Sequence, residues 1–265
     1  MGSSDYYARG LELGRLERDG RPRLEHVRTL ELLDRFLPPP PALVLDVGGG
    51  PGAYAVPLAE RGYEVRLVDP VELHVEHSRT LAAGRFEARL GDARELEEPD
   101  GSVDAVLLLG PLYHLVERPE RLRALAEARR VLKPGGVVAA AAISRFASFL
   151  DGLVATGVRE PEFVELVRRT LAEGTHVNPR EDDRPGWFTT AYFHRPEELA
   201  AEVEEAGFEL EALLAVEGPG WIAERIDEDA DPAADEVLLD ALRRVEAEPA
   251  LMGASLHLLA VGRKV

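Results

Sequence analysis

A glycine-rich stretch at residues 44–52, with the sequence VLDVGGGPG, is the part of the chain best suited to holding a small ligand. Its apolar start predicts a buried strand, which the glycines break before a helix begins near Ala53. Glycine accepts positive φ angles in such a turn, and its missing Cβ lets a ligand touch the backbone. The stretch therefore predicts a ligand site at the carboxyl end of a strand.

The glycine spacing fits more than one class of ligand. Gly48, Gly50 and Ala53 satisfy the dinucleotide fingerprint G-x-G-x-x-G/A. Asp69 follows at about the twenty-residue distance expected for an acid that binds a ribose. A nicotinamide-dependent oxidoreductase is therefore one interpretation, and a tight strand-to-helix turn that binds nothing is another.

Two features favour a cationic ligand over a pyrophosphate. Pro51 lacks a backbone N–H at the start of the helix, where a pyrophosphate would need donors. Asp46, Asp69 and Asp92 lie at the ends of predicted strands, so we expect their carboxylates to ring one pocket. Carboxylates repel phosphates and attract an ammonium or a sulfonium group.

Apolar runs alternate with amphipathic stretches, which predicts βα repeats and a parallel sheet with right-handed crossovers. Predicted strands cover residues 42–47, 64–68, 85–90, 103–109, 137–142, 208–216 and 255–261. Predicted helices cover residues 23–37, 53–60, 71–83, 119–132, 196–206 and 231–247, after a further helical pattern that starts at Tyr6. The rhythm breaks over residues 144–190, where we expect an inserted lid.

Five segments together carry a family resemblance: LDVGGGPG at residues 45–52, LVDP at 67–70, GDA at 91–93, DAVLLLG at 104–110 and RVLKPGG at 130–136. In this order and spacing they resemble class I S-adenosylmethionine-dependent methyltransferases of the small-molecule, natural-product type. The resemblance implies an α/β, Rossmann-like, seven-stranded and mostly parallel sheet with S-adenosyl-L-methionine as cofactor. It also implies a helical cap at residues 1–40, a cofactor-binding domain at 41–143 and 194–265, and a substrate lid at 144–193.

The resemblance assigns roles in cofactor binding to particular residues. Gly48, Gly50 and Gly52 would pass under the methionine portion, and the Asp69 carboxylate would accept hydrogen bonds from both ribose hydroxyls. Asp92 would receive the adenine amino group, with the Ala93 backbone beside it. The cofactor-binding positions that complete this expected set are Asp46, Pro70, Leu109, Gly110 and His114. Taken singly, Asp69 and Asp92 could also be turn or helix-cap aspartates.

Catalytic candidates follow the fourth predicted strand, where open α/β folds place their chemistry. Tyr113 and His114 offer a phenol and an imidazole there, and a histidine can accept a proton from a hydroxyl or an amine. His114 could equally be a packed loop residue, and His176 and His194 are further possible bases. Methyl transfer to a carboxylate would need no base at all, because that acceptor is already ionised at neutral pH. The leaving group is activated in any case, so the protein mainly has to align donor and acceptor.

The acceptor pocket is expected between the cap and the lid, since these parts differ from the bare cofactor-binding core. Residues 217–221, with the sequence EGPGW, could close the far wall of this pocket. Aromatic candidates for its lining are Tyr6, Tyr7, Phe146, Phe149, Trp187, Phe188, Tyr192 and Phe193, although such residues also serve as anchors of a lid. The acceptor would be a small molecule or a peptide, methylated on oxygen or nitrogen. A protein that binds the cofactor without turnover is an alternative from another class.

The amino-acid composition limits the classes of molecule that this protein is expected to bind. A formal net charge of −18 disfavours binding to nucleic acid or to an anionic membrane. The absence of cysteine excludes thiolate metal sites and thiol nucleophiles, and we expect no metal. No apolar run is long enough for a membrane span and no secretory signal is recognisable, so we expect a cytoplasmic protein, as a monomer or a homodimer.

Overall fold

The computed structural model describes residues 21–155, 157–179, 187–223, 231 and 233–265. The helical pattern expected from Tyr6 onward, including Tyr7, lies outside the described residues, as does most of the charged, proline-rich loop up to residue 186. No helix within the described ranges is both long and apolar enough to cross a membrane.

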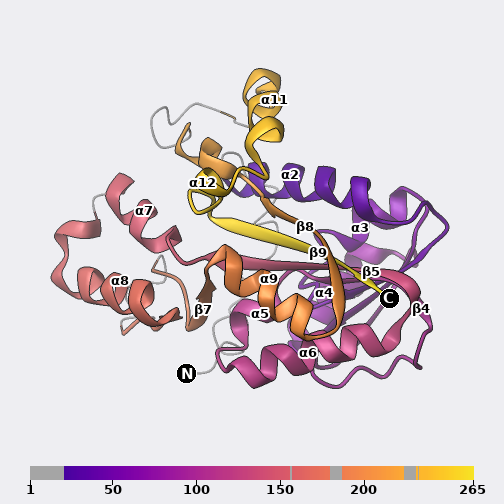
Figure 1. The fold of residues 1–265 in the computed structure, drawn as a ribbon. Coiled ribbons are helices and arrows are strands. Elements are labelled where there is room, and N and C mark those ends of the chain that lie inside the picture. The colour runs from indigo at the N-terminus through magenta and orange to yellow at the C-terminus, as the bar shows by residue number, and fades with distance from the viewer. Residues whose placement is uncertain (1–20, 156, 180–186, 224–230, 232) are drawn as a thin grey trace.

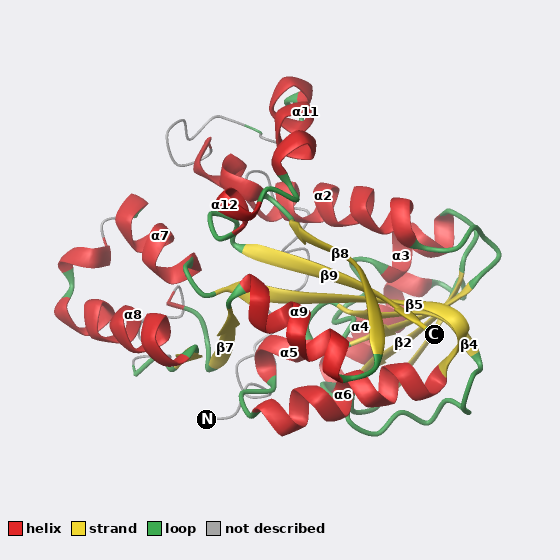
Figure 2. Ribbon diagram, in the orientation of Figure 1, coloured by secondary structure: helices red, strands yellow, loops and turns green. Residues whose placement is uncertain are grey.

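A single large sheet forms the centre of the fold (Figure 2). Its strand order is β3-β2-β1-β4-β5-β7-β6, and β9 pairs with β5 and with β8. The five parallel strands at its centre are β1 (Leu43–Val47), β2 (Glu64–Asp69), β3 (Glu87–Leu90), β4 (Val103–Leu108) and β5 (Leu132–Ser144). The two antiparallel strands after them are β8 (Phe208–Ala215) and β9 (His257–Lys264). The expected α/β fold with a mostly parallel sheet is confirmed.

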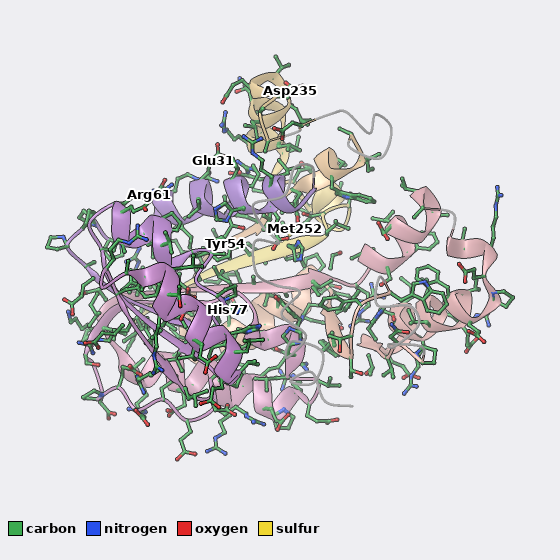
Figure 3. All side chains as sticks on the ribbon, turned by 180° about the vertical axis from the view of Figure 1, so that it is seen from behind. Glu31, Tyr54, Arg61, His77, Asp235 and Met252 are labelled. Atoms are coloured by element: carbon green, nitrogen blue, oxygen red, sulfur yellow. The ribbon has the colours of Figure 1, made fainter. Side chains whose placement is uncertain are left out.

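Helices cover both faces of the sheet because successive strand residues point to opposite sides. In β5, for instance, Ala139 packs into one buried cluster and Ala140 into the other. The first cluster lies under α2 (Arg21–Phe36), α3 (Ala55–Glu60) and α4 (Glu72–Ala82), on the face turned toward the viewer in Figure 3. The second lies under α6 (Arg118–Val131) and α9 (Pro196–Glu205). This two-sided burial explains why the central strands read as continuous apolar runs.

The sheet is larger than the seven strands expected. Within the predicted lid, β7 (Ala191–His194) runs parallel to the end of β5, and β6 (Thr175–His176) pairs antiparallel with β7. The sheet therefore has nine strands, and the stretch expected to be all lid contributes β6 from Thr175 and β7 from Ala191. Strands of two and four residues are too short to give a periodic pattern, so the sequence offers little signal for them.

Three helices of the predicted lid extend beyond the sheet next to β7 (Figure 1). They are α7 (Ala147–Val154), the short helix η2 (Gly157–Arg159) and α8 (Pro161–Glu173). These helices have a core of their own around Phe163, Leu166 and Val167. A Cβ on Gly152 would lie 2.3 Å from the Phe163 ring, so glycine is required for α7 to pack this closely.

The chain after β8 contains one predicted helix and two short elements that were not predicted. The acidic helical region is α11 (Glu236–Val245), whose first turn is capped by the Asp235 side chain through the N–H groups of Val237 and Leu238. Two four-residue turns, η4 (Gly218–Trp221) and α12 (Pro249–Met252), hold the ends of β8 and β9 together. Both are too short for sequence periodicity to reveal them.

Candidate functional site

The glycine loop after β1 has the positive φ angles that its sequence predicts. Gly48, Gly50 and Gly52 have φ angles of +70°, +57° and +101°. The loop is closely packed below, because a Cβ on Gly48 would lie 2.8 Å from Cγ of Pro111, the first residue of α5 (Pro111–His114). By contrast, a Cβ on Gly50 would meet no atom within 4 Å. The loop is therefore clamped on one side and open on the other.

The open side of the loop faces a cavity of about 270 Å³ at the carboxyl ends of β1, β2, β3 and β4. Eight of the expected cofactor-binding residues line it: Gly48, Gly50, Asp69, Pro70, Asp92, Ala93, Gly110 and His114. The expected catalytic residue Tyr113 lines it as well. Asp46, Gly52, Leu109 and His194 do not belong to its wall.

Asp69 is held rigidly at the end of β2. Its carboxylate accepts hydrogen bonds from the N–H groups of Gly50 and Val71, both at 2.9 Å, and lies 3.1 Å from Nδ1 of His74. An ionised carboxylate has about four acceptor positions, so these contacts leave room for about one further donor. One ribose hydroxyl can therefore bind Asp69 in this geometry, and a second would require His74 to turn away.

The expected ring of three free carboxylates is not what the cavity contains. The Arg94 guanidinium binds both oxygens of Asp92, at 2.9 and 2.6 Å, and this hydrogen bonding lowers the pKa of Asp92. Arg94 lines the cavity beside its partner, so positive charge offsets the carboxylate there. The adenine amino group would share Asp92 with this arginine, while Ala93 contributes a buried wall.

Asp46 lies beneath the loop, outside the cavity wall. Its residue is fully buried, and its two carboxylate oxygens have no hydrogen-bond partner among the described residues. A Cβ on Gly49 would be only 2.6 Å from its Oδ2 atom, so the loop lies directly against the carboxyl group. Burial, with a smaller contribution from the charge of Asp69, raises the pKa of Asp46 to about 7. This group consequently titrates near neutral pH.

Tyr113 and His114 form an aromatic wall with one residue of the lid. Their rings lie 4.6 Å apart, and the Phe188 ring lies 6.4 Å from Tyr113 and 6.2 Å from His114. Phe188 has a φ angle of +70°, a conformation that bulky residues rarely adopt. Burial lowers the pKa of His114 to about 4, so its imidazole is neutral and weakly basic at pH 7.

The other two candidate bases belong to the packed interior. His194 is fully buried, with Nε2 at 3.3 Å from Glu202, which also binds the buried guanidinium of Arg121. His176 is fully buried too, donates from Nε2 to the Trp187 carbonyl at 2.7 Å and stacks on Phe193. Neither lines the cavity, so neither is placed to contact a ligand there.

Other expected aromatic residues serve mainly as anchors. Tyr192 lies under the Arg121 guanidinium at 3.8 Å, and Phe146 has the Arg195 guanidinium at 5.6 Å. Phe149 and Trp187 pack on the core of the lid helices, and Phe193 packs against Ile143 at the end of β5. Of the expected aromatic set, Phe188 lies beside the Tyr113 and His114 rings that line the cavity.

Six further residues line the cavity although they were not among the expected site residues: Val71, His74, Gly91, Arg94, Pro111 and Leu115. Two of them carry a signal that was available in the sequence. Arg94 follows Asp92 by two residues, and His74 lies within the first turns of the helix that follows Asp69. A side chain with hydrogen-bond donors so close to a candidate ligand-binding acid is a natural partner for it.

Comparison with known proteins agrees with this geometry. Residues 44–136 match the model of a family described as a methyltransferase domain. An uncharacterized methyltransferase of Mycobacterium tuberculosis is 39% identical over 127 residues, and the match spans about half of each chain, 48% in both cases. A ubiquinone biosynthesis O-methyltransferase of Xanthomonas axonopodis pv. citri is 32% identical over 197 residues, covering 72% of this chain and 73% of that protein.

Solved structures show the same fold at low sequence identity. A SAM-dependent methyltransferase from Methanosarcina mazei has a TM-score of 0.62 at 18% identity, covering 88% of this chain and 97% of that one. An S-adenosylmethionine-dependent methyltransferase from Mesorhizobium loti has a TM-score of 0.59 at 19% identity, covering 91% and 100%. Together with the ordered motifs and the cavity that they line, these matches show that the chain belongs to the class I S-adenosylmethionine-dependent methyltransferases.

Proposed function

We propose that this protein transfers a methyl group from S-adenosylmethionine to an oxygen atom of a small molecule. The observation that carries the proposal is the cavity at the carboxyl ends of β1 to β4, in which an open glycine loop faces the fixed carboxylate of Asp69. The name of the Xanthomonas relative, an O-methyltransferase, supports oxygen as the target atom.

The residues present fit this donor. The cavity volume is close to the lower end of the range for small-ligand pockets. Gly50 leaves space for close approach to the backbone, and Asp69 retains acceptor capacity for a ribose hydroxyl. The raised pKa of the neighbouring Asp46 marks a place where a nearby cation would stabilise the carboxylate. When bound, S-adenosylmethionine would supply an activated methyl group on a sulfonium.

The protein would contribute mainly alignment and exclusion of water. Asp69 would fix the ribose and the glycine loop would lie under the methionine portion, while Tyr113 and His114 line the cavity with Phe188 packed beside them. Effective alignment of two reactants is worth several kcal/mol, up to roughly 7–11 in intramolecular models. A neutral His114 suits a wall around a cationic donor, since a protonated imidazole would repel it.

Two experiments test the proposal in sequence. Isothermal titration with S-adenosylmethionine, S-adenosylhomocysteine and NAD should show binding of the two adenosyl ligands and no comparable binding of NAD. Label should then pass from methyl-labelled donor to phenols or alcohols in an acceptor panel that also holds amines and carboxylates. Tight NAD binding alone would indicate the oxidoreductase instead, and donor binding without transfer to any acceptor would indicate a non-catalytic binding protein.

Replacing Asp69 by alanine should weaken binding of S-adenosylhomocysteine at least tenfold. The substitution removes a charge-assisted hydrogen bond, typically worth about 1.5–3 kcal/mol, and frees the N–H groups that position the loop. Titration calorimetry measures the loss. Glu72→Ala is the matched control, because it removes an exposed carboxylate at the start of α4, the helix that follows Asp69. Equal affinities of the two variants would show that the ribose is bound elsewhere.

A further inference from the structure

A buried arginine joins the cavity wall to the strand β7, on which the chain returns from the predicted lid to the sheet. The Arg121 side chain of α6 is 1% exposed, and its guanidinium contacts both the end of α5 and β7. In Figure 1, β7 lies between α5 and α9 on one side and the helices α7 and α8 of the predicted lid on the other. Arg121 therefore lies where the cavity wall and the lid meet.

The first contacts of Arg121 fix the end of α5. Its Nη1 atom donates hydrogen bonds to the carbonyl groups of Leu115, at 3.0 Å, and Val116, at 2.6 Å. The last carbonyl groups of a helix have no partner within the helix, so an arginine that binds them there fixes where the helix end lies. Leu115 lines the cavity directly after its two aromatic residues. Pro111, at the other end of α5, packs on Gly48, so a shift of α5 would disturb the whole wall.

The second contacts of Arg121 hold β7. The face of its guanidinium covers the Tyr192 ring, with Cζ 3.8 Å from the ring centre, which is within the range of cation–π attraction. Its Nε and Nη2 atoms donate to both oxygens of Glu202 in α9 at 2.8–3.2 Å. Glu202 in turn lies 3.3 Å from Nε2 of His194, the last residue of β7. Four of the five N–H groups of the guanidinium are thus engaged.

The charges of this group are fixed around neutral pH. Burial alone would raise the pKa of Glu202, but hydrogen bonds from His194 and Arg121 outweigh it and lower that pKa to about 2. Burial lowers the pKa of His194, so the positive charge beside Glu202 belongs to Arg121 and to Arg118, whose Nε lies 3.7 Å away. A buried ion pair contributes little net stability, because removing two charges from water costs about as much as their attraction returns. Its presence is better explained by a role in positioning.

β7 is bound in turn to the chain on both sides of the lid helices. The Phe193 N–H donates to the carbonyl of Gly174, at the end of α8, at 2.8 Å, and Thr175 of β6 pairs with Tyr192. Arg145, where the chain leaves β5 for α7, donates from Nε to the Phe193 carbonyl at 2.7 Å and from Nη2 to the Tyr192 hydroxyl at 3.2 Å. The position of β7 therefore sets where the lid helices begin and end.

We propose that Arg121 is a positioning residue that couples the lid to the cavity, because it keeps α5, with Tyr113 and His114, in the place that β7 sets. The inference rests on the proposed function, since the ligand that packs against α5 is the adenosyl donor. A donor in the cavity should then stabilise β7 and α8, neither of which contributes a described residue to the cavity wall. In this way the bound donor organises the side of the site where the acceptor is expected.

Amide hydrogen exchange of the full chain with and without S-adenosylhomocysteine tests the coupling. At a ligand concentration of about 100 times Kd, amides whose opening is linked to binding exchange up to about a hundredfold more slowly. In the wild type we expect exchange to slow at least about tenfold in peptides from β7 and α8 as well as from α5. In Arg121→Lys the slowing should remain in α5 and fall below about twofold in β7 and α8. Lysine has three N–H donors, too few for two carbonyls and both oxygens of Glu202.

Two further comparisons separate coupling from stability. Arg121→Met combined with Glu202→Gln removes both charges, leaves neither buried without a partner and should lose the coupling as Arg121→Lys does. Arg129→Met is the matched control, because Arg129 lies near the other end of α6 and donates to the Gly207 carbonyl at 3.0 Å. Tyr192→Phe keeps a ring under the guanidinium and should retain the coupling, whereas Tyr192→Leu should lose it.

The Tyr192 variants leave the ion pair in place, so they decide the question even where an Arg121 variant does not fold. A purely structural Arg121 would lower protection equally with and without ligand and keep the ligand-induced slowing in β7 and α8. That result would overturn the inference, as would equal slowing in Tyr192→Leu and Tyr192→Phe. A wild type that binds S-adenosylhomocysteine without added protection of β7 would overturn it too. If the wild type does not bind this ligand at all, the proposed function itself is refuted.

Discussion

Gly48→Ala is expected to reduce both the stability of the protein and its affinity for adenosyl ligands severely. Alanine at a φ of +70° costs roughly 1–2 kcal/mol, and its Cβ would lie 2.8 Å and 2.9 Å from two ring carbons of Pro111. That ring is part of the backbone at the start of α5 and cannot rotate away. Overpacking of this kind typically costs a further 1–3 kcal/mol. Because α5 carries Tyr113 and His114, its displacement should also distort the cavity wall.

Alanine substitutions at two other glycines distinguish the cost of a strained φ angle from the cost of a steric clash. Gly135 has a φ of +78° and Gly50 a φ of +57°, and a Cβ on either would meet nothing within 4 Å. Gly135→Ala, at the opposite edge of the sheet, should cost stability alone. Gly50→Ala should cost similar stability and in addition weaken S-adenosylhomocysteine binding, because its methyl group would enter the cavity. Urea unfolding and titration calorimetry give the two quantities, and identical results for Gly48→Ala and Gly135→Ala would contradict the role of Pro111.

The parallel core could be predicted because its sequence pattern has one physical meaning. A strand covered on both faces must be apolar throughout, and residues such as Val106 and Leu107 of β4 are indeed fully buried on opposite sides. Glycine at positive φ is similarly specific, which is why the loop at Gly48 and Gly50 was identifiable. The short strands β6 and β7 were not, because their pairing depends on neighbouring strands and not on local periodicity.

The position of the candidate site could be predicted from the sequence, but the charged and polar groups around its carboxylates could be predicted only in part. Asp69 and Asp92 line the cavity as expected, yet the expected set did not include His74 and Arg94, which contact them. Asp46 was expected in the cavity wall and lies beneath the loop instead, since alternate residues of a strand point away from one another.

Pairs distant in sequence were beyond prediction for a different reason. Glu217 and His257 are forty residues apart along the chain, and Arg121 and Glu202 are eighty-one apart. Only the tertiary fold brings each pair together, so no spacing in the sequence reveals it. The expectation that residues 217–221 would border the pocket stays a prediction. The contact of Phe188 with His114 likewise depends on how the lid packs.

Asp46→Asn should change the pH dependence of stability more than any other single carboxylate substitution at the site. The folded protein holds the Asp46 proton up to a pKa of about 7, whereas an unfolded aspartate loses it near 3.8. Between these values the folded state binds more protons than the unfolded state, so this group's contribution to stability is present at low pH and is lost as pH rises from about 4 to 7. The loss amounts to ~4 kcal/mol.

The decisive measurement is the difference between unfolding free energies at pH 4.5 and pH 8, for the wild type and for Asp46→Asn. Asparagine keeps the shape of the side chain but does not ionise. The unfolding free energy of the variant should therefore fall much less between pH 4.5 and pH 8 than that of the wild type. The matched control is Asp104→Asn, because Lys133 and the Leu43 N–H stabilise the ionised form of Asp104 and its pKa is lowered. Asp104→Asn should have the opposite effect on the pH dependence of the unfolding free energy, because it removes a contribution that increases as pH rises through the acid range.

Ligand binding should reveal the same titration independently. A sulfonium or an ammonium bound above the loop would stabilise the Asp46 carboxylate and lower its pKa. Because the group is about half protonated at pH 7, binding of S-adenosylmethionine should release up to about half a proton. Calorimetry in buffers of different ionisation enthalpy measures this release, which Asp46→Asn should abolish and Asp104→Asn should preserve. Proton release that persists in Asp46→Asn would assign it to another group and leave Asp46 without a part in recognising the donor.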